Sequence, residues 1–245
     1  MRSFLLLSSV AAAAQAASEY QFSSSYLNGF NNPRISSSTG GHAVCIEGSI
    51  PITASANNTK LNYTSPANQT IVTETIVEMF QINSTLAKQT VAGPHLVRGT
   101  WDIYGKLCYP VETRPNPEVL QFLIHGVGFD RSYWDVAANY SYVDAAALAG
   151  YTTFSYDRLG IGMSATPDPI NIVQSQLEVA IAHELIQLLR AGNISNCAFK
   201  KVVSVGHSFG SIQTVGLTSQ HPKDLDAAVL TGFSTSAAGQ PSFFA

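Results

Sequence analysis

The stretch Gly-His-Ser-Phe-Gly at residues 206–210 decides the fold, because a short apolar strand pattern at 201–205 leads into it and a helical pattern at 211–219 follows it. A Gly-x-Ser-x-Gly sequence on such a strand-to-helix turn is typical of a nucleophile elbow, which lifts a serine oxygen clear of the sheet. Only glycine fits at the flanks of a turn this tight. The sequence therefore predicts a nucleophile at Ser208. The elbow around it is predicted to consist of Gly206, His207 and Gly210.

Strand and helix patterns alternate on both sides of this turn. Residues 172–190 repeat apolar side chains at Leu177, Ile181 and Leu185, which places them on one face of an amphipathic helix. Alternation of this kind predicts an α/β protein with a doubly wound, mostly parallel sheet and helices on both of its faces. The other predicted elements are strands at 119–124, 151–156 and 225–230 and a helix at 132–147.

The N-terminal part has a different composition. Residues 17 to about 70 are rich in Ser, Asn, Thr and Gly and show no sustained periodicity. We expect them to pack over the core through short strands anchored by Cys45. Residues 90–98 and 100–109 flank Gly99 and resemble a β-hairpin.

The first residues predict secretion. Arg2 supplies a positive charge, residues 4–14 form an apolar run, and Ala14-Gln15-Ala16 is a small-x-small cleavage site. This pattern is typical of a secretory signal peptide, and its apolar run is too short to span a bilayer. We therefore expect cleavage before Ala17, a mature chain without a transmembrane segment, and an extracellular location.

The surface is predicted to be poor in charge and rich in glycans. Charged residues make up only 12% of the chain, about half the usual ~25%, and the net charge is −3. The absence of a basic patch argues against nucleic-acid binding. A surface with so little charge needs another source of solubility, and Asn-x-Ser/Thr sequons behind a signal peptide predict glycosylation. The predicted acceptors are Asn57, Asn62, Asn68, Asn83, Asn139 and Asn193.

Three cysteines are present, Cys45, Cys108 and Cys197. In an oxidising compartment at least one pair is expected to be bridged. We predict a Cys45–Cys108 disulfide, because both residues lie in the β-rich part of the chain and Cys197 follows a helix. Two roles stay open for Cys197, a buried free thiol or a bridge to another molecule.

Three motifs together resemble the α/β-hydrolase superfamily, specifically secreted, fungal-type serine hydrolases of the AB hydrolase-1 type. Leu-Ile-His-Gly-Val-Gly at 123–128 stands where the family carries its His-Gly oxyanion loop. Asp-Arg-Leu-Gly-Ile-Gly-Met-Ser at 157–164 matches the family's Asp-Arg-x-Gly-x-Gly-x-Ser turn, and the elbow at 206–210 is the third motif. Each motif follows a predicted strand. The resemblance covers residues 100–235 and implies the α/β-hydrolase fold.

The resemblance also implies roles for the motif residues. The backbone N–H groups of Val127 and Phe209 would form the oxyanion hole, and the helix beginning at Phe209 adds a dipole that favours negative charge. In the family the histidine of the oxyanion loop is usually structural, which is the role implied for His125 beside Gly126 and Gly128.

Other side chains near the motifs have expected structural roles. Asp157 and Arg158 are expected to brace their loop by hydrogen bonds and an ion pair. Packing is the expected role of His207. Tyr133 and Trp134 either line the cleft or pack in the core.

In the family the acid and the histidine of the triad follow the serine in sequence. The candidates after Ser208 are His221, Asp224 and Asp226. About 13 residues of helix separate them from Ser208, or roughly 20 Å, and place them on the wrong side of the sheet. We therefore expect a chain that is truncated at its C-terminus, lacks the strands carrying the acid and the histidine, and has little or no turnover by itself.

The function that the resemblance implies is a secreted serine hydrolase that cleaves an ester or related acyl bond of a small-molecule or lipid-like substrate, without a cofactor or a metal. The alternative is a secreted, non-catalytic hydrolase-like binding protein. Lipases, esterases and peptidases share this elbow, so it defines no single substrate. The expected organisation is a signal peptide at 1–16, a glycosylated N-terminal extension at 17–98 and a partial α/β-hydrolase domain at 99–245.

Overall fold

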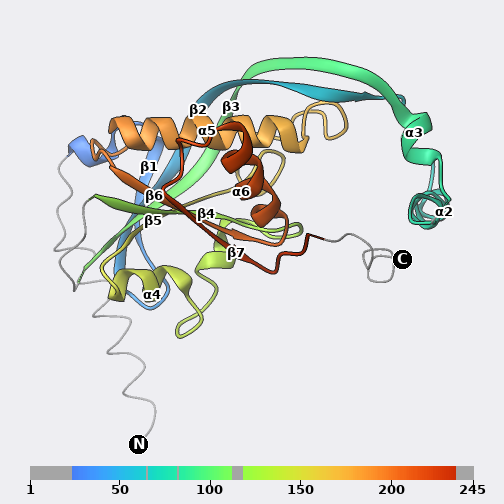
Figure 1. Cartoon of the computed structure of the whole chain (residues 1–245). Coiled ribbons are helices and arrows are strands. Elements are labelled where there is room, and N and C mark those ends of the chain that lie inside the picture. The colour runs from blue at the N-terminus through green and yellow to red at the C-terminus, as the bar shows by residue number, and fades with distance from the viewer. Residues whose placement is uncertain (1–23, 65, 82, 112–117, 236–245) are drawn as a thin grey trace, which may run out of the picture.

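The computed structural model describes residues 24–64, 66–81, 83–111 and 118–235, and the predicted signal peptide lies outside these ranges. In this part of the chain seven strands form one sheet in the order β1-β2-β3-β5-β4-β6-β7 (Figure 1). The strands are β1 (Asn31–Ser37), β2 (Ala43–Leu61), β3 (Val91–Pro110), β4 (Val119–Ile124), β5 (Thr152–Tyr156), β6 (Lys201–His207) and β7 (Ala227–Thr231). The helices are η1 (Ser24–Leu27), α2 (Gln69–Met79), α3 (Leu86–Thr90), η2 (Arg131–Trp134), α4 (Tyr142–Leu148), α5 (Ser175–Ala191) and α6 (Phe209–Gln220).

Strands β5, β4, β6 and β7 form the parallel half of the sheet, and the strands predicted there are confirmed. Their sequences are near-continuous apolar runs because helices cover both faces of this half. Phe122 of β4 lies beside Phe154 of β5, and the two fully buried rings stack with centroids 5.7 Å apart. The parallel half therefore has the architecture that the alternating pattern predicted.

Helices α5 and α6 lie on one face of the sheet and α4 lies on the other (Figure 1). The amphipathic pattern of α5 is confirmed, because Leu177, Ile181 and Leu185 are at most 1% exposed. Gly192 ends this helix in the left-handed conformation with φ of 73°, which glycine adopts without a Cβ clash.

The helix predicted at 132–147 is only partly correct. The structure has a short 3-10 turn, η2, and then the separate helix α4. Asn139 interrupts the helical path with φ of 69°. Ser141 then caps α4, because its hydroxyl accepts the N–H of Asp144 at 3.0 Å.

Strands β1, β2, β3 and β5 pair antiparallel, so the sheet is mixed rather than mostly parallel. The short strands expected between residues 17 and 70 are only partly correct, since β1 has 7 residues but β2 has 19. The hairpin expected around Gly99 is wrong, because β3 continues through Gly99 and pairs with β2 at Ala54. A Cβ at Gly99 would lie 2.8 Å from the ring of Trp101. This glycine therefore makes room for a tryptophan and does not mark a turn.

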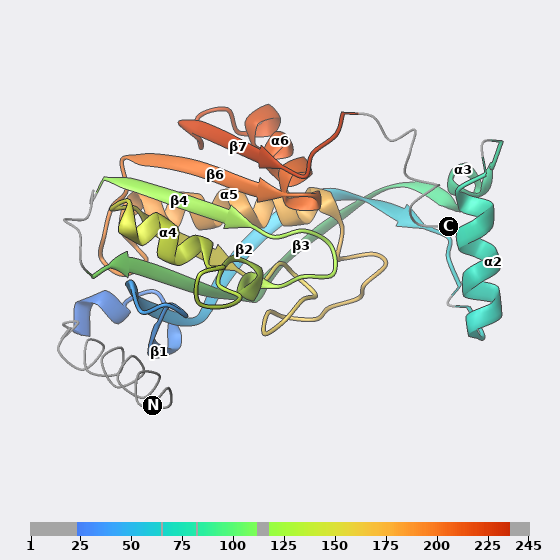
Figure 2. The same ribbon diagram turned by 90° about the horizontal axis from the view of Figure 1, so that it is seen from below.

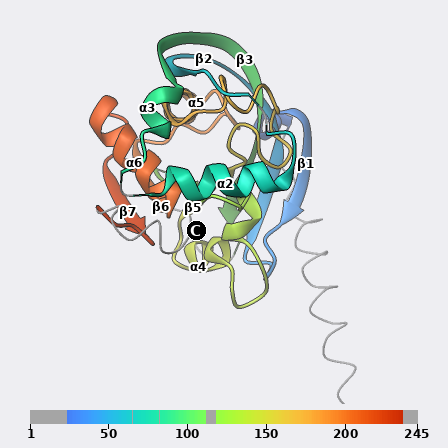
Figure 3. The ribbon, with the colours of Figure 1, turned by 90° about the vertical axis from the view of Figure 1, so that its right-hand side faces the viewer.

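The far halves of β2 and β3 leave the body as a two-stranded arm that carries α2 and α3 at its tip (Figure 1). Two contacts fix the arm to the segment before α5. The Asn58 side chain donates to the carbonyl oxygens of Asn171 and Ile172, both at 3.0 Å. Gln174 donates to the Thr59 carbonyl and accepts the Thr59 N–H, both at 2.8 Å. Viewed from the side of the arm, α2 lies across the front of the body (Figure 3).

The predicted disulfide is confirmed. Cys45 and Cys108 face each other in the β2–β3 register and are bonded. Cys197 is a half-buried free thiol, and burial raises the pKa of that thiol, which keeps it protonated at neutral pH. No helix among the described residues is long and apolar enough to cross a membrane.

Candidate active site

The carboxyl ends of β4 and β6 lie side by side, with Ile124 in register with Gly206. From this point the chain winds outward in both directions, to β5 through α4 and to β7 through α6. Open α/β sheets bind ligands at such a switch point, beyond the carboxyl ends of the strands. Figure 2 shows the arrowheads of β4, β6 and β7 pointing to the side on which α2 stands.

Ser208 occupies the turn between β6 and α6. Its backbone takes φ of 52° and ψ of −116°, a conformation that costs a non-glycine residue of order 1–3 kcal/mol. Two backbone hydrogen bonds hold it: the Ser208 N–H donates to the Thr231 carbonyl at 2.9 Å, and the Ser208 carbonyl accepts the Ser211 N–H at 2.9 Å. The residue is exposed, and its hydroxyl makes no capping hydrogen bond to α6. The strained turn thus presents a free hydroxyl at the end of the sheet.

The two flanking glycines permit this turn by having no side chain. A Cβ at Gly206 would lie 2.5 Å from the carbonyl oxygen of Gly210. A Cβ at Gly210 would overlap the carbonyl oxygen of Ile124 and lie 2.9 Å from that of His125. Real Cβ atoms essentially never come within 3.0 Å of such atoms. The expectation that glycine is required at both flanks agrees with this geometry.

The loop after β4 passes directly over the serine. A Cβ at Gly126 would stand 3.1 Å from the Cβ of Ser208, so the two backbones are in close contact. Within the described part of the chain no backbone carbonyl accepts the N–H of Val127. Phe209 is the first residue of α6, and the N–H groups of a helix's first turn have no acceptor inside the helix. The N–H groups of Val127 and Phe209 therefore have no backbone acceptor among the described residues.

His125 is fully buried, and both of its ring nitrogens are engaged. Nε2 accepts the backbone N–H of Arg158 at 3.2 Å, which requires Nε2 to be unprotonated. Nδ1 therefore carries the proton and donates it to the Gly126 carbonyl at 2.9 Å. Burial lowers the pKa of His125 from 6.5 to about 4, so the ring is neutral at neutral pH. These two hydrogen bonds hold the loop after β4 against the turn after β5, and they leave His125 no free nitrogen to act as a base.

We expect His125 to make the protein acid-sensitive. Its pKa is lower in the folded state than in the unfolded state, so the unfolded chain binds the proton first. The stabilisation is therefore complete above pH 6.5, is lost as the pH falls from 6.5 toward 4, and changes no further below 4. The loss is about 3 kcal/mol in the free energy of unfolding. Urea unfolding from pH 4 to 8 measures it.

The carboxylates of the protein titrate in part of the same pH range, so His125→Asn is compared with the parent and with His95→Ala. His95 is exposed on β3 and serves as the control. Between pH 6.5 and 4, the free energy of unfolding of His125→Asn is expected to fall by about 3 kcal/mol less than that of the parent or of His95→Ala. Equal slopes in all three proteins would contradict the role of His125.

Arg158 connects the oxyanion loop to the elbow. Its guanidinium donates to the Gly126 carbonyl at 3.3 Å and lies over the Phe209 ring, 4.8 Å from the centroid. It also forms an ion pair with Glu178 of α5 at 3.0 Å, and both side chains are buried. Gln213 of α6 donates to the same carboxylate at 2.6 Å. Burial is the largest effect on Glu178 and raises the pKa of its carboxyl group.

The Asp-Arg turn after β5 is braced as predicted, although the ion-pair partners come from other segments. The fully buried Asp157 carboxylate accepts the Met163 N–H at 2.8 Å and pairs with the Arg131 guanidinium at 2.6 Å. A Cβ at Gly162 would lie 2.5 Å from the Asp157 carboxyl carbon, so glycine is needed beside this carboxylate. The sequence analysis missed Arg131 and Glu178. Glu178 could have been found, because it is a charged residue next to Leu177 on the apolar side of α5.

Aromatic rings stand beside the serine. Tyr133 stacks on His207 at 4.8 Å between ring centroids, and Phe129 packs on Tyr133 at the same distance. His207 bonds through Nδ1 to the Thr231 hydroxyl at 3.1 Å, which confirms a packing role for this ring. Trp134 is 4% exposed and belongs to a core cluster against which Tyr133 packs. Both rings line a cavity of about 760 Å³ together with His207.

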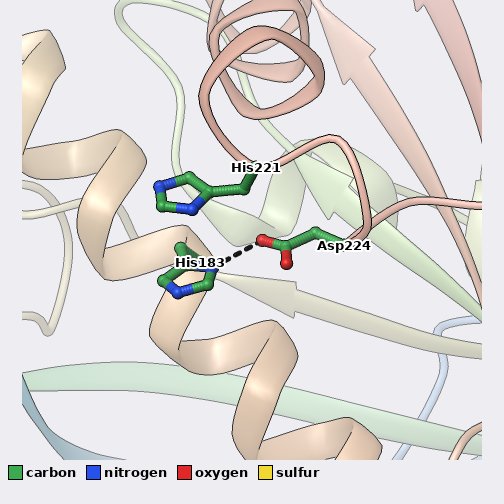
Figure 4. A group of neighbouring side chains, drawn as sticks. All are labelled: His183, His221 and Asp224. Carbon is green, nitrogen blue, oxygen red and sulfur yellow. Dashed lines mark hydrogen bonds and ion pairs between the residues drawn. The ribbon is translucent and has the colours of Figure 1, made fainter.

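The charged candidates that follow the serine lie elsewhere. His221 ends α6, at the opposite end of this helix from Ser208, and Asp224 lies in the loop before β7. Both contact His183 of α5, as Figure 4 shows. Asp226 pairs with Arg190 at 2.7 Å and Lys201 at 2.8 Å. All three candidates are therefore engaged at the end of α6 that is remote from the elbow.

All six predicted glycosylation acceptors are exposed. Exposure is a condition for modification by a glycosyltransferase, so the structure is compatible with glycans at these positions. Glycosylation itself stays a prediction.

A mixed sheet with parallel central strands and a serine at the strand-to-helix turn of β6 and α6 defines the architecture of an α/β-hydrolase. The chain belongs to the alpha/beta hydrolase family, whose model matches residues 121–244, about half of the chain. No curated protein matches the chain.

Several solved structures are similar to part of the chain. Epoxide hydrolase VrEH1 from Vigna radiata is 21% identical over 53% of this chain and 34% of its own, with a TM-score of 0.41. The esterase EaEST from Exiguobacterium antarcticum is 16% identical over 53% of this chain and 41% of its own, also with a TM-score of 0.41. Epoxide Hydrolase A from Mycobacterium thermoresistibile is 19% identical over 52% and 35%, with a TM-score of 0.41. The chain thus spans well under half the length of the structures it matches.

Proposed function

We propose that this protein is a secreted serine hydrolase that cleaves an ester or related acyl bond of a small-molecule or lipid-like substrate. Ser208 is the nucleophile, and the backbone N–H groups of Val127 and Phe209 form the oxyanion hole. The observation that carries the proposal is the close approach of the Gly126 loop to the exposed, strained Ser208. A carbonyl carbon placed on this hydroxyl would have its oxygen between two backbone donors.

The acyl-transfer step follows from these positions. The Ser208 oxygen attacks the carbonyl carbon, the carbonyl electron pair moves onto oxygen, and the two N–H groups stabilise the resulting oxyanion. Collapse expels the alcohol and leaves an acyl group on Ser208, which water then removes. The serine proton must go to a base. Neither His125 nor His207 has the free, acid-paired ring this requires, so neither of these two histidines supplies the base.

A signal peptide at 1–16, a glycosylated extension at 17–98 and a hydrolase domain from 99 onward belong to the same proposal. The exposed sequons and the disulfide support the secreted location. Family membership supports the hydrolase activity.

The test measures covalent labelling of Ser208, because labelling does not need a complete catalytic cycle. The 245-residue chain is incubated with an alkyl fluorophosphonate, with and without free imidazole as an external base. The adduct is located by peptide mass spectrometry. Oxyanion-hole catalysis without a triad is still worth about 10³–10⁴ over water. We therefore expect slow labelling of Ser208 that imidazole accelerates at least about 10-fold.

The matched control is Ser219→Ala, because Ser219 is an exposed serine at the other end of the same helix. We expect Ser208→Ala to abolish the adduct and Ser219→Ala to leave it unchanged. A folded protein that shows no adduct at Ser208, with or without imidazole, would contradict the proposal and favour the non-catalytic binding protein.

A further inference from the structure

Two histidines and a carboxylate meet at the end of α6 that is remote from Ser208. His183 lies in the middle of α5 and His221 is the C-cap residue of α6. Asp224 lies three residues after His221 (Figure 4). The proposed hydrolase function uses none of them. Twelve residues of α6 separate this cluster from the elbow, a distance of about 18 Å at ~1.5 Å per residue.

The donor atoms of the cluster are close enough for one metal ion to reach all three. One ligand atom from each residue lies within 4.8 Å of the other two. The imidazole rings of His183 and His221 stack with centroids 3.7 Å apart and planes 12° from parallel. His183 Nδ1 stands 2.6 Å from a carboxylate oxygen of Asp224. A tetrahedral zinc ion with bonds of about 2.0–2.1 Å holds its donors roughly 3.3–3.4 Å apart. Because an imidazole binds an ion in the plane of its ring, one of the two stacked rings must rotate out of the stack when the ion binds.

The carboxylate is already held in place. Asp224 is 4% exposed. Gln187 donates to its second carboxylate oxygen at 2.8 Å, which leaves the first oxygen to His183 alone. The Arg190 guanidinium donates to the Asp224 backbone carbonyl at 2.8 and 3.1 Å. Outer contacts that orient ligating groups in this way are characteristic of metal sites.

The charges around the cluster balance. Asp224 and the nearby Glu184, which acts on His221, are negative. Lys223 lines the same cavity, and the positive charge of Arg190 is shared with Asp226 at 2.7 Å. A dication would therefore meet a carboxylate and two imidazoles, and the charge of Arg190 is already paired with Asp226.

We propose that His183, His221 and Asp224 bind a zinc ion. Two imidazoles and one carboxylate form a donor set that suits zinc among the divalent ions. The ion takes the place of the hydrogen bond between His183 Nδ1 and Asp224, and the neutral His183 ring then carries its proton on Nε2. The fourth position faces a cavity of about 420 Å³ that the cluster lines with Gln187 and Arg190, so water can occupy it. The bound ion ties α5 to the loop between α6 and β7.

Zinc alone is the probe in the first experiment. Untagged 245-residue chain, stripped with chelator, is titrated with Zn²⁺ by calorimetry and by competition with a chromophoric chelator. We expect one zinc site per chain. At a zinc concentration about 100 times the Kd, the melting temperature should rise by roughly 5–10 °C. Co²⁺ in the same site should give the visible absorption of a tetrahedral ion.

The variants are His221→Ala, Asp224→Asn and the control His95→Ala, which removes an exposed histidine on β3. We expect the first two to lower zinc affinity at least about 10-fold and to remove the gain in melting temperature. His95→Ala should leave both unchanged. If either site variant fails to fold, His183→Gln on α5 provides the same comparison. Zinc binding that survives all three site substitutions, or no binding by the parent chain, would overturn the proposal. Neither result bears on labelling of Ser208.

Discussion

A Gly210→Ala protein is expected to lose more than about 3 kcal/mol in the free energy of unfolding. The added Cβ would overlap the Ile124 carbonyl oxygen, lie 2.7 Å from the Ile124 carbonyl carbon and lie 2.9 Å from the His125 carbonyl oxygen. These are backbone atoms of β4 and of the loop that follows it, so no side-chain rotation relieves the clash. Alanine favours a helix over glycine by about 1 kcal/mol, and the clash must exceed that gain. Urea unfolding at pH 7 measures the change.

Gly216→Ala is the matched control, because Gly216 lies in the same helix. Its added Cβ would meet a methyl group of Val179 at 3.0 Å, and a side chain on α5 can shift by the small amount needed. The cost of the small clash then nearly cancels the gain from the higher helix propensity of alanine. We expect the free energy of unfolding of Gly216→Ala to stay within about 1 kcal/mol of that of the parent. A change within about 1 kcal/mol of zero in Gly210→Ala as well would show that the elbow tolerates a side chain at Gly210 and that our explanation of this glycine is wrong.

The parallel half of the fold was predictable because its signals are local. Buried strands read as apolar runs, and α5 repeats its apolar residues with helical spacing. The elbow was also predictable, because a serine in this turn needs glycine on both sides at a fixed spacing. His125, Arg158 and Ser208 each lie in a short motif directly after a strand, so their places at the ends of β4, β5 and β6 could be predicted from the sequence.

The antiparallel half was not predictable in the same way. The residues of β2 that lie beyond the body alternate between polar and small side chains, as in Ala54 to Asn57, and resemble a loop in composition. Pairing with β3 makes this segment a strand, and that pairing joins residues up to 67 positions apart. Gly99 misled the prediction because a glycine that makes space for Trp101 looks the same in sequence as a glycine in a turn.

The site's supporting contacts were also invisible in the sequence. Arg131 reaches Asp157 and Glu178 reaches Arg158 across the tertiary structure, and the partners are 26 and 20 positions apart in the sequence. No short motif encodes such a pair. The cluster of His183, His221 and Asp224 has the same character, because its members come from two elements that meet only in the fold.

Removing Arg158 should cost about 3–5 kcal/mol, because it leaves the buried Glu178 carboxylate without its cation. Arg158→Met keeps the length of the side chain and removes its charge. Burial already raises the pKa of Glu178, and loss of the guanidinium should raise it further. The folded variant then binds a proton more readily than the unfolded chain. Its deficit relative to the parent should therefore shrink as the pH is lowered from 8 to 5.

Two further measurements separate a broken ion pair from general damage at Arg158. The double variant Arg158→Met/Glu178→Leu removes both charges, and we expect it to be more stable than Arg158→Met alone. Loss of the guanidinium also removes one of the two hydrogen bonds to the Gly126 carbonyl and the cation over the Phe209 ring. Imidazole-assisted labelling of Ser208 should therefore be slower in both variants. A double variant as unstable as the sum of its single variants, with a deficit independent of pH, would show that Arg158 and Glu178 act separately. In that case the link from α5 to the elbow would have to run through packing and not through this ion pair.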